Sequence, residues 1–363
     1  MRDSTTRERP TAEIYSLVEP LAAEWEELAE QTRASPFRRP GWIVAWWRAF
    51  GKGTLEILTI RRDGRLVAVL PLSRQFGALS STTNWHTPEF GPVIQDPPAL
   101  QALAEELFLR APRRVSLAFV DAAGPTLREC REAASSCGYK VLTRTLERSP
   151  FLLIDGDWQA YEQGLSRNTR GDAKRRIRRL KETGSMSVEV LDGSERLDNV
   201  LAEGFRTEAA GWKGEHGTAI ASRRDTESFY REIAHWAAGR GWLRLAFLRL
   251  DGRPIAVHYS LEHNGVHYLM KVGHDSSYDG FSPGKVLMYE MLLRAFSSEL
   301  HSYEFLGGDD AWKRLWTTSH RERELFQAFE RSLPGAIEWA GFRYGRPLAR
   351  RLSRHWPLTL LRR

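Results

Sequence analysis

Two cysteines in 363 residues are too few for a disulfide framework. Cys130 and Cys137 are seven residues apart, so on a helix they share one face, where we expect small core side chains and not a metal or redox pair. The chain also lacks any run of the ~18 apolar residues that a membrane span needs. No apolar segment follows the polar first ten residues. We therefore expect a reduced, cytoplasmic protein without a secretory signal.

Excess charge is missing from most of the chain. The net charge is +7, but Pro334–Arg363 contributes +6 of it, because seven arginines stand there against Glu338. The nearly neutral remainder disfavours general nucleic-acid binding. The tail also contains aromatic and leucine side chains, so it could lie on an anionic membrane surface or dock on the body as a terminal helix. Pro347 and Pro357 argue against one continuous helix.

What the chain does contain is a repeat. Its length predicts two domains, and RRDGRLVAV at Arg61–Val69 matches RLDGRPIAV at Arg249–Val257 in six of nine positions. Each copy joins two alternating apolar segments through Asp-Gly, which favours a β-hairpin. We predict a duplicated α+β unit with domains at 12–149 and 150–333, followed by a basic aromatic tail at 334–363.

An anion site is predicted at the start of a helix in the second half. Ser282-Pro283 is a favourable N-cap and first helical residue, and a strand ending in Val272-Gly273 comes before it. The N–H groups of Gly284, Lys285 and Val286 would then face an anion such as a pyrophosphate. The same residues also suit an ordinary helix start without a ligand.

Five short motifs in order carry a family resemblance over residues 12–333. They are Ser35-Pro36-Phe37 with the Trp-rich segment after it, the Leu/Arg pattern from Leu165 to Leu180, Gly211-Trp212-Lys213-Gly214 with Gly217-Thr218-Ala219, Ser282-Pro283-Gly284, and Tyr303–Trp316. With this order of elements the chain resembles the Gcn5-related N-acetyltransferase (GNAT) superfamily, and specifically its CelD-type branch, which is related to the Fem peptidoglycan aminoacyltransferases.

The resemblance implies a mixed α/β (α+β) fold of two tandem GNAT-like domains, each a twisted, mostly antiparallel sheet flanked by helices, with a degenerate N-terminal copy. It implies an acyltransferase that uses acetyl-CoA or another acyl-CoA, without a metal, to acylate an amino-sugar, polysaccharide or cell-envelope precursor. The alternatives are a Fem-like transferase that uses aminoacyl-tRNA, or a non-catalytic binding protein. Ser-Pro-Gly-Lys replaces the family's glycine-rich turn, and Trp312 stands where the branch has a tyrosine.

Acyl transfer from a thioester needs a base for the acceptor, donors for the oxyanion and an acid for the thiolate. Among the carboxylates near the family motif we favour Asp310, Asp309 or Glu304 as the base, although Asp309 also suits a helix cap. Lys313 would hold an acceptor anion or pair with these aspartates. A second set of candidates lies on the preceding strands. His258, on the expected polar face of its strand, is a further base, and Tyr268 is a weaker candidate for the acid.

Arg167–Lys181 has eight basic side chains against Asp172. A narrow apolar stripe indicates a helix that packs on one side. Its basic side is either simply solvated, or it binds coenzyme A phosphates, an anionic acceptor or a tRNA acceptor stem.

Overall fold

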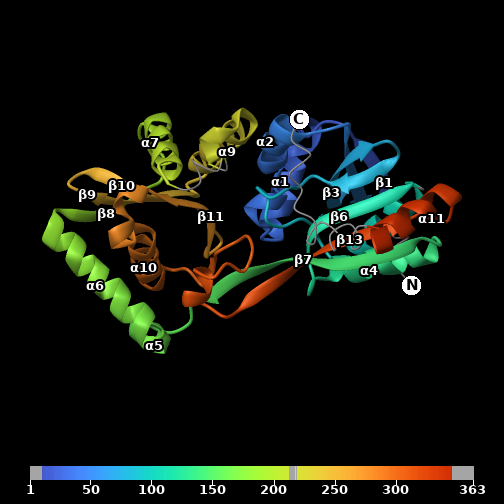
Figure 1. The fold of residues 1–363 in the computed structure, drawn as a ribbon. Coiled ribbons are helices and arrows are strands. Elements are labelled where there is room, and N and C mark those ends of the chain that lie inside the picture. Colours follow the sequence, from blue (N-terminus) through green and yellow to red (C-terminus); the bar gives the residue numbers. More distant parts are fainter. Residues whose placement is uncertain (1–9, 111, 212–216, 218, 346–363) are drawn as a thin grey trace, which may run out of the picture. The chain divides into compact units, whose positions relative to one another are not determined.

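The computed structural model describes residues 10–345 except 111, 212–216 and 218 (Figure 1). The chain divides into two compact units. The first comprises residues 1–40, 51–146 and 322–363, and the second comprises residues 41–50 and 147–321. These ranges differ from the expected boundaries at two places, because the last strand returns to the first sheet and residues 41–50 pack in the second unit.

The first unit is a mixed sheet with helices. Its strands follow the order β1-β2-β3-β4-β6-β13-β7, antiparallel from β1 to β4 and parallel between β4 and β6. The elements are β1 (Thr11–Tyr15), α1 (Ala22–Gln31), β2 (Thr54–Arg62), β3 (Arg65–Gln75), β4 (Ala78–Ser81), β5 (Val93–Ile94), α3 (Pro97–Leu109), β6 (Arg114–Asp121), α4 (Pro125–Ser136), the first part of β7 (Lys140–Leu153), β13 (His320–Phe329) and α11 (Leu333–Ala340).

The second unit has the order β7-β12-β11-β10-β9-β8, with β11 and β12 parallel. Helices α7 and α9 cover one face of this sheet, and α6 and α10 cover the other (Figure 1). The elements are α2 (Pro40–Phe50), α5 (Trp158–Gly164), α6 (Arg167–Thr183), β8 (Met186–Leu191), α7 (Leu197–Ala209), α9 (Arg224–Ala238), β9 (Leu243–Leu250), β10 (Arg253–His263), β11 (Val266–His274), the 3₁₀ segment η4 (Ser276–Phe281), α10 (Pro283–Phe296), β12 (Ser302–Glu304) and the 3₁₀ turn η5 (Lys313–Leu315).

The repeat found in the sequence forms corresponding hairpins in the two units. Both turns place Asp and Gly at positive φ, at 51° and 75° in the β2–β3 hairpin and at 51° and 79° in the β9–β10 hairpin. The first arginine of each copy joins its hairpin to a helix: Arg61 bonds Glu24 of α1 at 2.7 and 2.9 Å, and Arg249 bonds Glu203 of α7 at 2.8 Å twice. The duplicated α+β unit is thus confirmed by contacts as well as by strand order.

A buried ion cluster holds the first unit together between β4 and β13. Glu89 pairs with Arg38 at 3.0 Å and with Arg323 at 3.1 Å, and it accepts a hydrogen bond from Ser35. Arg323 is only 5% exposed. Burial acts to raise the pKa of Glu89, but the two guanidinium groups outweigh it and hold the pKa at about 2.

Two local expectations were wrong. Asp309 is not a helix cap, because only the 3₁₀ turn η5 follows it and no side chain caps that turn. Cys130 is buried, but Cys137 at the end of α4 is exposed and is not a core residue. The motif residues 212–214 and 218, and the tail beyond residue 345, lie outside the described residues.

Candidate active site

Two neighbouring strands of the second unit separate in the middle of the sheet. β11 and β12 run parallel, and their ladder ends at the pair Tyr268–Glu304. β11 continues to His274, with a bulge at Met270 in its pairing to β10. No described strand borders this side of β11 beyond Tyr268. β11 therefore runs on beyond the end of its ladder with β12, and this separation marks the candidate site.

The start of α10 lies at the far end of this strand. A Cβ added to Gly284 would lie 3.6 Å from Nδ1 of His274, the last residue of β11. Ser282 adopts a left-handed conformation with φ of 49°, and its side chain does not cap the helix. The N–H groups of Lys285 and Val286 both donate to the Ser282 carbonyl, at 3.0 and 3.3 Å.

The prediction of three free amide groups at this helix start is therefore wrong for two of them. Lys285 and Val286 use their amides inside the first turn, because the left-handed Ser282 turns its carbonyl toward them. The N–H of Gly284 has no acceptor among the residues that the structure describes. It is the main-chain donor that remains for an anion at the start of α10.

Val272 and Gly273 have packing roles in addition to any ligand role. Val272 lies opposite His258 of β10 and packs against the core under α10. A Cβ on Gly273 would lie 2.5 Å from the Cα of Glu208 in α7, so glycine is required there by the close approach of the helix.

Glu304 is the predicted carboxylate nearest to the strand opening. It is 6% exposed and pairs with Arg321 through two nitrogens, at 2.9 and 3.1 Å, and it accepts a hydrogen bond from Ser302. The adjacent Tyr303 packs on the α10 face. Strand alternation therefore directs Glu304, and Tyr268 beside it, to the face covered by α7.

Lys313 is enclosed by its own turn. Its side chain is 6% exposed, and Nζ contacts the carbonyl oxygens of Leu306 and Gly308 at 2.6 and 2.8 Å and Asp310 at 3.0 Å. An ammonium has three donors, and all three have partners here. Lys313 therefore stabilises the turn, in which Leu306 and Gly307 have φ of 54° and 61°.

Asp309 and Asp310 lie on the outside of the same turn. Their side chains are 41% and 59% exposed, and Asp309 pairs with Arg314 at 3.1 Å. Each aspartate thus has a cation partner of its own, and their carboxylates remain open to water. The structure does not bring them to the Tyr268–Glu304 pair through any described contact.

His258 was expected on a polar strand face, and this is wrong. The residue is 1% exposed, and its face of β10 is covered by α10, where the neighbouring Ala256 packs with Val286 and Leu287. The alternation of polar residues along β10 reflects a buried polar layer and not a solvated face.

That polar layer contains an ion cluster which the sequence did not reveal. Glu262 of β10 bonds Arg244 at 2.7 Å, Arg294 of α10 at 2.5 Å and Nδ1 of His267 at 3.0 Å. His267 is fully buried and stacks on Tyr303, with ring centroids 4.3 Å apart. Desolvation lowers the pKa of His267 despite the carboxylate beside it. The only sequence signal was the polar spacing along β10.

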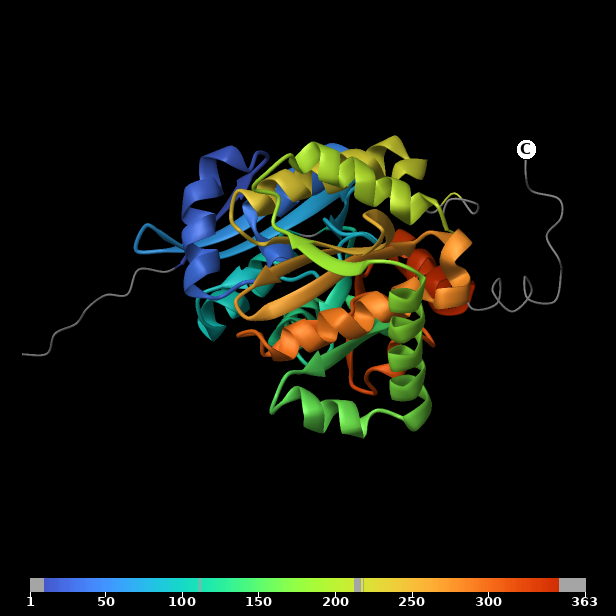
Figure 2. The ribbon, with the colours of Figure 1, turned by 90° about the vertical axis from the view of Figure 1, so that its left-hand side faces the viewer.

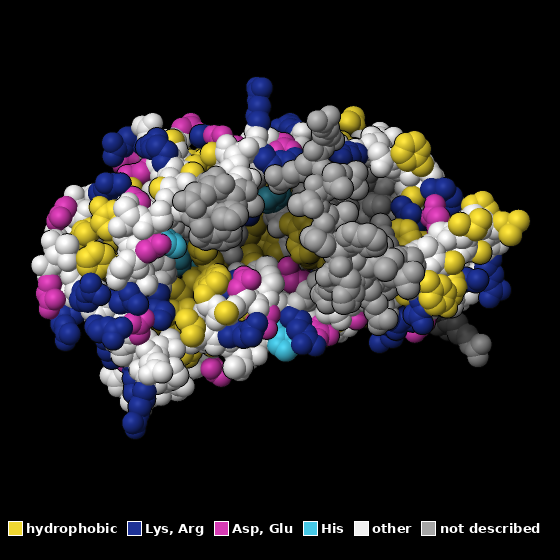
Figure 3. Space-filling model, in the orientation of Figure 1, with side chains coloured by type: hydrophobic (Ala, Val, Ile, Leu, Met, Phe, Trp, Pro, Cys, Tyr) yellow, Lys and Arg dark blue, Asp and Glu magenta, His cyan; other side chains and the backbone are white. Residues whose placement is uncertain are grey.

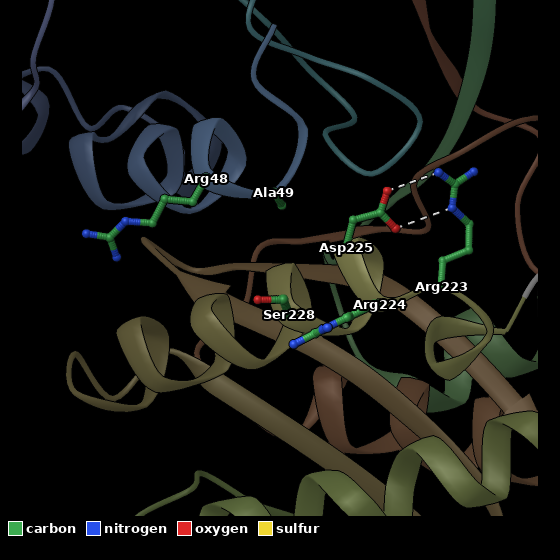
Figure 4. A pocket seen from close by; sticks show the side chains of 6 residues that line it. All are labelled: Arg48, Ala49, Arg223, Arg224, Asp225 and Ser228. Atoms are coloured by element: carbon green, nitrogen blue, oxygen red, sulfur yellow. Dashed lines mark hydrogen bonds and ion pairs between the residues drawn. The ribbon is translucent and has the colours of Figure 1, made fainter.

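A separate open depression of about 640 Å³ lies between the end of α2 and the start of α9 (Figure 4). Three arginines line it, and two of them are already paired: Arg48 with Glu232 at 2.6 Å, and Arg223 with Asp225 at 3.0 Å. None of the predicted site residues lines it.

Among the described residues we find no cluster that could hold a metal, and no helix with the length and hydropathy to cross a membrane.

A family model described as an acetyltransferase (GNAT) domain matches residues 167–314, which include β11, β12 and α10. No curated protein matches the sequence. Among solved structures, FemX is 14% identical with a TM-score of 0.58, covering 83% of this chain and 95% of its own. The C-terminal domain of a putative lysylphosphatidylglycerol synthetase from Agrobacterium fabrum is 12% identical, with a TM-score of 0.58 and coverage of 89% and 95%.

A conserved protein of unknown function from Bacteroides thetaiotaomicron is 10% identical with a TM-score of 0.52, covering 88% of this chain and 100% of its own. At these identities the likeness concerns the fold alone. The second unit thus contains a segment that matches the acetyltransferase (GNAT) domain model, and the expected mixed α/β class, with mostly antiparallel strands flanked by helices, is confirmed. The CelD-type branch stays a prediction.

Proposed function

We propose that the second unit transfers an acyl group, in the simplest case acetyl, from acyl-CoA to an amine or hydroxyl of an amino-sugar, polysaccharide or cell-envelope precursor. The observation that carries this proposal is the separation of β11 and β12 after Tyr268–Glu304, within the segment that matches the acetyltransferase family model. The separated strand ends beside the start of α10, and this arrangement suits a thioester followed by a pyrophosphate.

In the proposed reaction the acceptor attacks the thioester carbonyl directly. Glu304 takes the proton of the attacking N–H or O–H, since it is the carboxylate at the strand opening. The oxyanion forms beside β11 after its bulge at Met270. The C–S bond then breaks, the acyl group stays on the acceptor, and the coenzyme A thiolate receives a proton from Tyr268. Tyr268 thus acts as the acid, a role for which the indole of Trp312 is unsuited.

Calorimetry with acetyl-CoA and a thiol-release assay across amino-sugar and polysaccharide acceptors test this proposal. We expect Glu304→Gln to lower kcat by roughly a hundredfold or more, while the matched change Asp310→Asn leaves kcat within about twofold, because Asp310 is a solvent-exposed partner of Lys313. The thermal midpoint of each variant establishes that it is folded. A wild-type protein that binds no acetyl-CoA would contradict acyl-CoA dependence. Loss of activity in Asp310→Asn, with activity retained in Glu304→Gln, would show that Asp310 and not Glu304 is the base.

The Fem-like alternative is favoured by one observation, the basic helix α6, whose Lys and Arg side chains gather on the surface in Figure 3. In that case charged tRNA would be the donor. The activity would then depend on aminoacyl-tRNA and disappear after RNase treatment. Acetyl-CoA binding without thiol release for any acceptor would instead favour a non-catalytic binding protein.

A further inference from the structure

Helix α6 packs against η4 and the start of α10 (Figure 2). Arg176 and Arg179, nearly one helical turn apart, both donate from Nη1 to the carbonyl of Gly280 in η4, at 3.2 and 3.4 Å. Lys285 in the first turn of α10 bonds Asp172 of α6 at 2.7 Å. Three cations therefore converge on the few residues before and after Ser282.

The charge of this group is only partly balanced. Asp172 is shared by Lys285, Arg176 and Arg175, and Arg179 has no carboxylate partner among the described residues. Burial acts to raise the pKa of Asp172, but the hydrogen bonds from Lys285 and Arg176 outweigh it and lower the pKa to about 2. Asp172 thus stays ionised and holds α6 in place, while Arg179 remains as excess positive charge.

Arg179 also lies on an aromatic ring. Its guanidinium carbon is 5.2 Å from the centroid of Phe281, the last residue of η4. A guanidinium that is fixed on a ring and bonded to a carbonyl loses little further freedom when it binds a phosphate. This position is pre-organised for a phosphate monoester next to the start of α10.

We propose that Arg179, supported by Arg176, binds the 3′-phosphate of coenzyme A, so that α6 recognises the nucleotide end of the acyl donor. The inference rests on the proposed acyl-CoA-dependent function. The N–H of Gly284 serves the pyrophosphate at the helix start, and the two arginines lie on the far side of Ser282, beside Gly280. A dianionic monoester suits paired guanidinium groups better than a pyrophosphate diester does.

Several Lys and Arg side chains of α6 are already paired with carboxylates, and this favours coenzyme A over a tRNA as the ligand of the helix. A polyanion would need a row of unpaired cations, but several outward cations of α6 already pair with carboxylates. These pairs are Lys174–Glu162, Arg175–Asp172 and Arg178–Glu182. Arg179 has no carboxylate partner among the described residues and lies on the ring of Phe281, so it offers a single phosphate site.

The test compares acetyl-CoA with its analogue that lacks the 3′-phosphate, acetyl-dephospho-CoA, by calorimetry on the full chain. We expect the wild type to bind acetyl-CoA about tenfold more tightly than the analogue. Arg179→Ala should lose that preference and keep its affinity for the analogue, which is the coupling expected of a direct contact. Arg178→Ala is the matched control, because Arg178 is 71% exposed on the same helix and pairs outward with Glu182 at 3.6 Å.

The outcomes separate this inference from the proposed function. Binding of both donors with equal affinity overturns the role of α6 and leaves the acyl-CoA site intact. Equal losses in Arg178→Ala and Arg179→Ala also overturn it, since they indicate only a general positive field. If neither donor binds the wild type, the proposed function fails first. Tight tRNA binding that Arg179→Ala abolishes, without a preference between the two donors, assigns α6 to tRNA instead.

Discussion

Replacing Lys313 by methionine should destabilise the second unit without removing a catalytic group. The ammonium is enclosed, with its side chain 6% exposed, and it is the donor to the carbonyl oxygens of Leu306 and Gly308 at 2.6 and 2.8 Å. Methionine keeps the length and much of the packing of the side chain. The change therefore chiefly leaves two carbonyl groups without a partner, each at a cost of about 1–3 kcal/mol.

Partial hydration of the carbonyls and the removal of a buried charge offset part of that cost. We expect the free energy of unfolding to fall by about 2–3 kcal/mol. Urea denaturation at pH 7, followed by tryptophan fluorescence, measures it. Asp310→Asn is the control, because Asp310 is 59% exposed and an exposed pair contributes under about 1 kcal/mol. A loss below about 0.5 kcal/mol in Lys313→Met would contradict a stabilising role of Lys313 in the turn. If such a stable variant had lost its activity, Lys313 would be catalytic.

Two further changes test a close helix–strand contact in the second unit and the buried ion cluster of the first unit. Gly273→Ala would place Cβ 2.5 Å from the Cα of Glu208, so we expect a loss of about 1–3 kcal/mol in urea denaturation, whereas Gly280→Ala, with open space around it, should change stability little. Glu89 has a depressed native pKa of about 2, so its stabilisation is complete above pH ~4.5 and is lost as the pH falls toward 2. Glu89→Gln should lower the free energy of unfolding by roughly 3 kcal/mol at pH 7, because buried Arg323 loses its partner. It should also flatten the decline of stability at acid pH. An unchanged decline would assign the acid sensitivity to other carboxylates.

Turns and helix starts that depend only on residues adjacent in the sequence were predicted well in two cases. The two Asp-Gly turns have the positive φ angles that their sequence indicates, and α10 begins at Pro283 after Ser282 as expected. Local sequence could not place Lys313, because its carbonyl partners become available only once Leu306 and Gly307 adopt positive φ. A lysine after two aspartates suggests an exposed ion pair until that turn is formed.

The sequence by itself determined the duplication, the hairpins and the start of α10, since each depends on residues within one turn or one strand. Tertiary structure decided which polar side chains are buried. Glu262 gathers partners from β9, β11 and α10, and His258 lies under α10 because that helix covers the strand face. It also decided that the opening begins after the pair Tyr268–Glu304, because β11 continues there and β12 ends. Burial and strand separation are properties of packed elements, and no local pattern specifies them.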